Sequence, residues 1–312
     1  MAKILIAEEM YREAVAELKS GYDVHFDPDL WKKPEDLAAQ VQTADALIVR
    51  NQTQVTRELV GRAGKLKVVG RLGVGLDNID LDACAAANVT VCPATGANAV
   101  SVAEYVLTTA MILVRGAYGA THRVIDGEWP RFDLVGREIF EKSLGIVGLG
   151  SIGQTVAEKT KALGLSVRAY DPLLADDDPA WNGIKRMQLD ELAATSDILT
   201  FQVPLIDATR NLVDAAFIGR MKASAILINT ARGGIVDEAG VVEALERGHL
   251  GGAALDVFAE EPLGKDAGQI FADVKNLILT PHISGVTSDS NRRVSFVTAE
   301  NVRQGLVRHS TN

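Results

Sequence analysis

Three polar residues follow apolar runs of the kind that form buried β-strands. Arg232 comes after the run ILIN, Glu261 after AALDV and His282 after LILT. Because the carboxyl ends of parallel strands meet at one edge of a sheet, we expect these side chains to lie close together. A guanidinium binds a carboxylate through paired hydrogen bonds, and an imidazole beside a carboxylate exchanges protons near neutral pH. Each residue alone also fits a surface ion pair or an ordinary loop position, but three equivalent positions make coincidence improbable.

A glycine-rich turn precedes these residues in the chain. Gly148, Gly150 and Gly153 form the pattern G-x-G-x-x-G after the apolar run Leu144–Val147, and Asp171 ends the next predicted strand. Such a turn lets the backbone approach a pyrophosphate at a helix N-terminus. An acid in the place of Asp171 accepts hydrogen bonds from ribose hydroxyls and repels a 2′-phosphate. The segment therefore predicts an NAD site, with a glycine turn of some other α/β protein as the alternative.

A second glycine pair, Gly73-Val74-Gly75, also follows a predicted strand but lacks the third glycine. Consecutive backbone N–H groups in such a turn can form a nest for an anion, for example a carboxylate. We therefore interpret it as a candidate substrate contact.

Short apolar runs alternate with helical patterns along the whole chain, which is typical of parallel βαβ units. The predicted fold is α/β with two doubly wound parallel sheets: a Rossmann NAD-binding domain, 98–286, inserted into a flavodoxin-like substrate domain, 1–97 plus 287–312. A hinge and a cleft between the domains would follow from the two crossings. The predicted strands are Lys3–Ala7, Val24–Phe26, Ala46–Val49, Lys67–Gly70 and Val89–Cys92, then Leu144–Val147, Ser166–Tyr170, Asp197–Phe201, Ala225–Asn229, Ala253–Val257 and Leu277–Thr280. The predicted helices include Tyr11–Ser20, Pro34–Gln40, Arg57–Arg62, Leu81–Ala87, Asn98–Arg115 and Ser290–Val307.

Composition excludes several classes of function. The 312 residues include 32 basic and 41 acidic side chains, a net charge of −9, which disfavours binding to nucleic acid or anionic lipid. Two cysteines, Cys84 and Cys92, make neither a disulfide framework nor a zinc site, so no metal is expected. The start has no signal-peptide pattern, and the apolar stretch Tyr105–Val114 is too short for a membrane helix. We expect a cytoplasmic protein.

Longer motifs give a specific resemblance over essentially the whole chain. They are GLGSIG with Asp171, NTARGGIVDE, ALDVFAEEP and LTPHISG, together with GVGLDNID, GAN and VAE nearer the N-terminus. The sequence resembles the D-isomer-specific 2-hydroxyacid dehydrogenases, which transfer a hydride between NAD and a 2-hydroxy acid.

The resemblance implies roles for individual residues. Arg232 would bind the substrate carboxylate, His282 would be the general base or acid, and Glu261 would favour the charged imidazolium. The Gly73–Gly75 nest would hold the same carboxylate. Cofactor contacts would come from Gly148, Gly150, Ser151, Ile152, Gly153, Asp171, Thr230, Ala231, Asp256 and Gly285.

The identity of the acid is less constrained. Arg50, Arg71 and Arg131 match positions that approach the distal phosphate in phosphoglycerate dehydrogenases, although each could be surface charge. A substrate with a second anion, first of all 3-phosphoglycerate, is therefore expected. Sulfolactate dehydrogenase and hydroxypyruvate or glyoxylate reductase are the alternatives.

Some positions depart from the family pattern, and other readings stay open. Gln202 stands where histidine is common, Ser284 where glycine is common, and Asn51 where serine is frequent. An NAD(H)-responsive corepressor, which binds partners instead of turning over substrate, is the alternative of another class. The helix Val100–Val114 and the segment through Trp129 resemble the family's dimerisation region, so a homodimer is expected.

Overall fold

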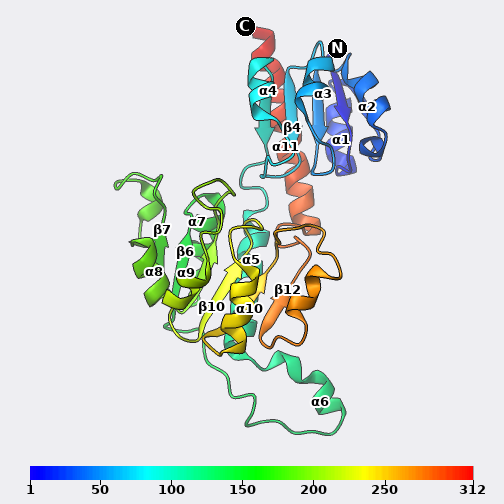
Figure 1. Ribbon diagram of the computed structural model, residues 1–312. Coiled ribbons are helices and arrows are strands. Elements are labelled where there is room, and N and C mark those ends of the chain that lie inside the picture. Colours follow the sequence, from blue (N-terminus) through cyan, green and yellow to red (C-terminus); the bar gives the residue numbers. More distant parts are fainter. Residues whose placement is uncertain (312) are drawn as a thin grey trace. The chain divides into compact units, whose positions relative to one another are not determined.

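The computed structural model describes residues 1–311 of the 312-residue chain. The chain forms two compact units, one made of Met1–Asn98 and the chain from Val286 onward, the other of Ala99–Gly285 (Figure 1). Both units are α/β with parallel sheets, which confirms the predicted fold class. The assignment of substrate to one unit and cofactor to the other stays a prediction at this point.

The first unit is built on a five-stranded parallel sheet in the order β2-β1-β3-β4-β5. In β3, Ala46 and Ile48 pack on one face of the sheet, and Leu47 and Val49 pack on the other. Helices α1 and α11 cover the first face, and α2, α3 and α4 cover the second. The strands are β1 (Lys3–Ile6), β2 (Asp23–Phe26), β3 (Ala46–Val49), β4 (Val68–Arg71) and β5 (Thr90–Pro93). The helices are α1 (Arg12–Lys19), α2 (Pro34–Val41), α3 (Arg57–Arg62), α4 (Leu81–Ala86) and α11 (Ser288–Thr311), with a 3₁₀ turn η1 (Leu30–Lys32).

Polar side chains define where the short helices of this unit begin. The Thr56 hydroxyl accepts a hydrogen bond from the Leu59 N–H, and the Asp80 carboxylate accepts one from the Ala83 N–H. Both are N-caps, which satisfy backbone donors that the first turn leaves without a helical partner. The loops that end β3 and β4 are therefore followed by helices with a defined start.

The second unit has a seven-stranded parallel sheet in the order β12-β11-β10-β9-β6-β7-β8. The chain starts at β6 and builds outward in both directions, so the point where strand order reverses lies between β6 and β9. The strands are β6 (Ser143–Val147), β7 (Ser166–Tyr170), β8 (Lys185–Arg186), β9 (Ile198–Phe201), β10 (Ala225–Asn229), β11 (Leu250–Leu255) and β12 (Leu277–Leu279). The helices are α5 (Ala99–Arg115), α6 (Thr121–Ile125), α7 (Ser151–Lys161), α8 (Leu189–Thr195), α9 (Ala215–Arg220) and α10 (Glu238–Glu246), with 3₁₀ turns η2 (Tyr118–Ala120), η3 (Pro179–Trp181) and η4 (Ala267–Phe271).

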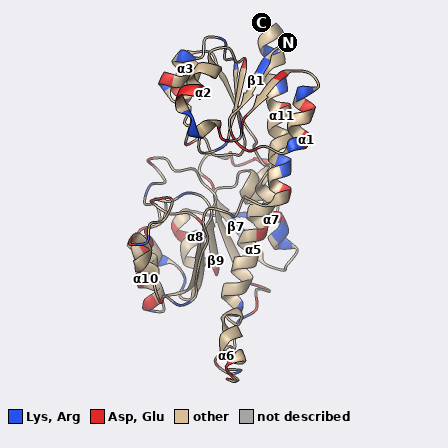
Figure 2. Ribbon diagram, turned by 90° about the vertical axis from the view of Figure 1, so that its right-hand side faces the viewer, with Lys and Arg blue, Asp and Glu red and all other residues tan. Residues whose placement is uncertain are grey.

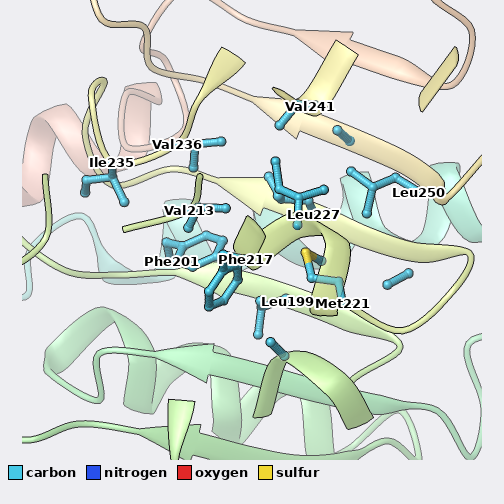
Figure 3. Close-up of a cluster of buried hydrophobic side chains, with 14 of the residues drawn as sticks. Leu199, Phe201, Val213, Phe217, Met221, Leu227, Ile235, Val236, Val241 and Leu250 are labelled. Atoms are coloured by element: carbon cyan, nitrogen blue, oxygen red, sulfur yellow. The ribbon is translucent and has the colours of Figure 1, made fainter. Parts of the chain in front are cut away.

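Apolar cores fill both faces of this sheet. Helices α5 and α7 pack on one face, while α8, α9 and α10 pack on the other around Phe201, Phe217 and Leu227 (Figure 3). Figure 2 shows charged residues on helices such as α2, α3 and α10, whereas the central strand β9, with the sequence ILTF, has none. The sheet is therefore buried on both sides, as all-parallel sheets generally are.

A long segment between α5 and β6 leaves the body of the second unit. It contains α6 and extends away from the sheet (Figure 1). Its apolar side chains Ile125, Trp129, Phe132 and Val135 are exposed. We call residues 118–135 the arm.

Within residues 1–311, no single helix is both long and apolar enough to cross a membrane. Only α5 taken together with the sharply bent segment Tyr118–Ile125 meets that requirement, by length and composition alone.

Candidate active site

The predicted dinucleotide turn connects β6 to α7. Gly148 has φ +93°, and a Cβ there would lie 2.6 Å from the Gln202 carbonyl oxygen, so the turn accepts only glycine. A Cβ on Gly153 would collide with the Gly148 carbonyl. Around Gly150 the described chain leaves open space. Because Gly150 stands at the N-cap of α7 and has no side chain, the first-turn N–H groups can face a pyrophosphate.

Asp171 stands beside this turn, at the end of β7. One carboxylate oxygen accepts a hydrogen bond from the Leu149 N–H at 2.8 Å, and the other accepts one from the Leu173 N–H at 2.9 Å. The backbone thus fixes the carboxylate next to the glycine turn. Further acids at Asp176, Asp177 and Asp178 follow in the same connection. Negative charge at this place fits ribose hydroxyls and disfavours a 2′-phosphate, so the residues present fit NAD.

Gln202, which replaces a common histidine, lies at the point where strand order reverses. Its side-chain amide donates to the Thr200 hydroxyl at 3.0 Å and to the Thr230 hydroxyl at 2.9 Å. The amide therefore links the ends of β9 and β10. Of the predicted cofactor contacts, Ser151 and Ile152 lie in the first turn of α7, and Thr230 and Ala231 directly follow β10.

His282 and Glu261 form a pair in the loops that follow β12 and β11. The His282 Nδ1 lies 2.7 Å from a Glu261 carboxylate oxygen, and the other oxygen accepts the Phe258 N–H at 2.9 Å. Since the carboxylate accepts, Nδ1 carries the hydrogen and Nε2 of the neutral ring is left as the acceptor. The His282 side chain is 48% exposed and can therefore meet a substrate.

Arg232 lies on a turn that Asn229 holds at the end of β10. The Asn229 amide donates to the Arg232 carbonyl at 3.0 Å, and its oxygen accepts the Ala231 N–H at 3.1 Å. The Arg232 guanidinium donates to the Ala231 carbonyl at 2.6 Å. A Cβ on Gly233 would collide with the Phe258 carbonyl, so this turn packs against the loop that leads to Glu261. The structure thus brings the loops of all three predicted catalytic residues to one edge of the sheet.

Asp256 holds the loop of His282 through hydrogen bonds, a role that the sequence did not predict. It is fully buried at the end of β11 and receives three successive N–H groups. The His282 N–H donates to its carbonyl at 2.7 Å, and the Ile283 and Ser284 N–H groups donate to its carboxylate at 2.8 Å each. These bonds support His282 in a left-handed conformation, with φ +53°. The predicted contact of Asp256 with the cofactor, like that of Gly285, stays a prediction.

A hydrogen-bond chain reaches Asp256 from helix α5. The Thr280 hydroxyl donates to the Asp256 carboxylate at 2.6 Å, and the Tyr105 hydroxyl lies 2.6 Å from the Thr280 oxygen. Thr280 has one hydroxyl hydrogen and gives it to the carboxylate, so Tyr105 is the donor to Thr280. Burial, together with the charge of Asp256, raises the pKa of Tyr105 to about 12 despite the bond to Thr280. Tyr105 therefore keeps its proton at neutral pH.

The first unit holds the other predicted substrate residues. Arg71 ends β4 opposite Val49 in β3, so Arg50 and Arg71 stand at the same edge of the sheet. The Arg71 guanidinium donates to the Leu72 carbonyl at 2.7 Å and occupies the space where a side chain on Gly73, φ +146°, would stand. A cation therefore accompanies the Gly73-Val74-Gly75 turn.

Arg131 differs from these two arginines. It is exposed on the arm of the second unit, and its N–H donates to the Trp129 carbonyl at 2.8 Å. The structure thus groups Arg50 with Arg71 but places Arg131 in the other unit. Within the described residues, no cluster of three or more His, Cys, Asp or Glu side chains could hold a metal ion.

The fold and these motifs define a class of protein. Residues 107–284 match the model of the D-isomer specific 2-hydroxyacid dehydrogenase NAD binding domain. The chain belongs to this family and is an NAD-dependent oxidoreductase that acts on a CH–OH group, which confirms the predicted class and cofactor.

The chain is also similar to particular proteins of known name. The chain is 48% identical to an (S)-sulfolactate dehydrogenase of Chromohalobacter salexigens, over 98% of this chain and 99% of that protein. It is 37% identical to a D-3-phosphoglycerate dehydrogenase of Methanocaldococcus jannaschii, over 98% of this chain but only 58% of the relative's length. A solved D-lactate dehydrogenase of Aquifex aeolicus, complexed with NAD and lactic acid, matches with a TM-score of 0.80 and 26% identity, over 99% of this chain and 96% of that one.

Proposed function

We propose that this protein is a sulfolactate dehydrogenase, which interconverts sulfolactate and its 2-keto acid with NAD. The observation that carries the proposal is the 48% identity to a sulfolactate dehydrogenase along nearly the full length of both chains. The phosphoglycerate dehydrogenases, which the sequence motifs placed first, are 36–38% identical, and this chain spans 54–59% of their length. The relatives therefore favour sulfolactate over 3-phosphoglycerate.

The stereochemistry of sulfolactate fits a D-specific family. The sulfur-bearing carbon outranks the carboxyl carbon in the priority rules, whereas the methyl carbon of lactate ranks below it. This exchange of priorities makes (S)-sulfolactate the spatial equivalent of D-lactate. The label S of the relative and the D-specificity of the family thus describe the same arrangement around the reacting carbon.

The second unit supplies the groups that the reaction requires. NAD, when bound, takes up or returns the hydride at the 2-carbon. Arg232 would hold the substrate carboxylate through two parallel hydrogen bonds and so orient that carbon. His282 would take the hydroxyl proton at Nε2 during oxidation and return it during reduction. Glu261, bonded to Nδ1, would hold the ring in the required tautomer and stabilise the imidazolium that forms.

The first unit supplies candidate partners for the sulfonate. Arg50 and Arg71 stand at the ends of neighbouring strands. The backbone N–H groups of the Gly73-Val74-Gly75 turn would hold the carboxylate instead. A sulfonate has one negative charge and three acceptor oxygens, whereas a phosphate monoester carries about −1.5 to −2 at pH 7. Two arginines carry two positive charges, which balance either group and exceed the single charge of a sulfonate.

A substrate panel tests the proposal. The rate of NADH formation is measured with (S)- and (R)-sulfolactate, D-3-phosphoglycerate, D-glycerate and D-lactate. We expect (S)-sulfolactate to have the highest kcat/KM, and Arg50→Ala to raise KM for sulfolactate but not for D-lactate. A preference for 3-phosphoglycerate would restore the first interpretation. Tight NADH binding without turnover of any acid would favour a corepressor-type protein instead.

We also propose that the chain forms a homodimer through α5 and the arm. Four side chains, those of Ile125, Trp129, Phe132 and Val135, expose a large apolar surface there, which is typical of a protein interface.

Cys84 and Cys92 are free thiols, and the cytoplasm, a reducing compartment, stays the predicted location.

A further inference from the structure

Glu8 is a buried carboxylate in the first unit, two residues after the end of β1. Glu8 is only 3% exposed to solvent. One carboxylate oxygen accepts the Arg50 N–H at 2.7 Å and the Thr53 N–H at 2.9 Å, and the other accepts the Gln52 N–H at 3.0 Å. A single side chain thus binds three backbone donors of the loop that follows β3.

Asn78 holds the same loop through its carbonyl groups. Its side-chain amide donates to the Thr53 carbonyl at 2.7 Å and to the Arg50 carbonyl at 3.2 Å. Glu8 binds the N–H groups and Asn78 binds the carbonyls, so residues 50–53 are fixed on both sides by side chains distant in sequence. Buried backbone groups that are paired in this way favour one conformation of the loop, although the buried Thr53 hydroxyl has no hydrogen-bond partner among the described residues.

The loop carries Arg50, which the proposed function assigns to the sulfonate. The Arg50 guanidinium donates to the side-chain oxygen of Asn291 in α11. Burial lowers the pKa of Arg50, while the charges of Glu8 and Glu9 oppose that shift. Arg50 is therefore held at its backbone by Glu8 and at its guanidinium by α11.

We propose that Glu8 is a positioning residue that fixes the 50–53 loop for the second anionic group of the substrate. This inference rests on the proposed function, because it takes Arg50 as a substrate contact. Glu8 itself would not touch the substrate, since its oxygens are committed to the loop backbone. Glu8 acts by holding the conformation of the loop, and its negative charge by itself would disfavour an anionic substrate.

An anchoring role and a charge role of Glu8 predict opposite changes in KM when the carboxylate is removed. If Glu8 mattered through its charge, loss of that charge near an anion site would lower KM for an anionic substrate. If Glu8 mattered as an anchor, loss of an acceptor would free the loop and raise KM. Glu8→Gln is the suitable change, because an amide keeps the size of the side chain but replaces one acceptor by a donor.

The expected result is a rise of roughly tenfold in KM for (S)-sulfolactate, with kcat little changed. The NADH dissociation constant, measured by fluorescence, and KM for D-lactate stay at wild-type values, because neither ligand has a second anionic group at this loop. Glu9→Gln is the matched control: Glu9 is adjacent and also near Arg50, but its side chain is 60% exposed. Glu9→Gln is expected to leave KM for (S)-sulfolactate unchanged or to lower it slightly.

Several outcomes would overturn the role of Glu8. A lower KM in Glu8→Gln would show a charge effect, and an equal rise for D-lactate or a weaker NADH affinity would show general loss of structure. If Glu8→Gln does not fold, Asn78→Ser removes the opposite anchor and must give the same selective rise in KM. Its failure to do so rejects the proposal.

The wild-type enzyme separates this proposal from the proposed function. It is first run with the acid panel, and the acid with a second anionic group that it uses best becomes the probe. If it uses none, the proposed function fails and the role of Glu8 fails with it. If it uses one and Glu8→Gln leaves its KM unchanged, only the role of Glu8 is rejected.

Discussion

His282 combines a left-handed backbone conformation with a partly exposed imidazole ring. Its φ of +53° lies in the left-handed region, which is uncommon for residues other than glycine, although Asn, Asp and His occur there more often than most. The bonds of residues 282–284 to Asp256 hold that conformation. The surroundings of His282 thus determine its backbone conformation, as they must where a residue other than glycine is left-handed.

Substitution of His282 by asparagine separates its chemistry from its backbone. Asparagine tolerates the left-handed region, so His282→Asn keeps the loop but removes the imidazole that is proposed to exchange the proton. We expect kcat to fall by about 10²–10⁴, while the NADH dissociation constant and the melting temperature stay close to wild type. Steady-state absorbance and fluorescence titration measure these quantities. His25→Asn, at an exposed position in β2, is the control and keeps full activity. Retention of more than about a tenth of kcat in His282→Asn would contradict the role.

Local sequence patterns predict some residues of the candidate site but not others, for a physical reason. Arg232, Glu261 and His282 follow apolar strands, so local sequence places them at the edge of a sheet. Glu8 and Tyr105 act through hydrogen bonds to partners far along the chain, 42 and 175 residues away. No local pattern distinguishes such a buried acid or tyrosine from its neighbours, and only the fold brings the partners together.

At the scale of elements, burial decides what could be predicted. Fully buried strands such as β3, β9 and β10 are almost entirely apolar, with Thr200 in β9 and Asn229 at the end of β10 as the polar members, and lie within one residue of the predicted bounds. The short strand β8 (Lys185–Arg186) was missed, because it has two exposed charged residues at the edge of the sheet. Its residues pair with Arg168 and Ala169 of β7 through backbone hydrogen bonds, which leave no hydrophobic pattern in the sequence.

Asp197 ties the starts of the two central strands together. It precedes β9, and its carboxylate accepts the N–H and the hydroxyl of Ser143 at the start of β6, as well as the Lys222 ammonium at 2.7 Å. Burial alone would raise the pKa of Asp197, but these hydrogen bonds and the charge of Lys222 outweigh it and lower the pKa to about 2. Folding therefore favours the charged carboxylate.

The sign of the pH dependence follows from this shift. A carboxyl with a depressed pKa stabilises the fold above its unfolded value of 3.8, and the contribution is lost as pH falls from there to about 2. We expect Asp197→Asn to lower the free energy of unfolding at pH 7 by on the order of 1–2 kcal/mol. The gap to wild type narrows below about pH 4.

Urea unfolding at a series of pH values measures this difference. Asp190→Asn is the control, because Asp190 pairs with Arg220 on the surface with a side chain that is 75% exposed. Such pairs contribute roughly 0–1 kcal/mol, so little change is expected. A difference between Asp197→Asn and wild type that stays constant from pH 7 down to pH 3 would reject the coupling.

At the scale of the whole molecule, net charge and local charge oppose each other. The chain carries −9, yet its family acts on anions. Under the proposed function, affinity for an acid comes from a few cations against this net charge: Arg232 in one unit, and Arg50 and Arg71 in the other. Raised ionic strength should weaken these attractions only modestly, because Arg50 is largely shielded from solvent.

The arm is the feature that the fold of a single chain leaves unexplained. Trp129 is 81% exposed and Phe132 is 86% exposed, although both are large apolar side chains. If a second copy covers them, Trp129→Ser with Phe132→Ser should convert a dimer of about twice 33.3 kDa into a monomer, because the buried apolar area is lost. Sedimentation velocity at micromolar protein measures the mass. Leu173→Ser, which removes an exposed leucine outside the arm, is the control and stays dimeric. A monomeric wild type, or a double variant that still sediments as a dimer, would show that the arm serves another purpose.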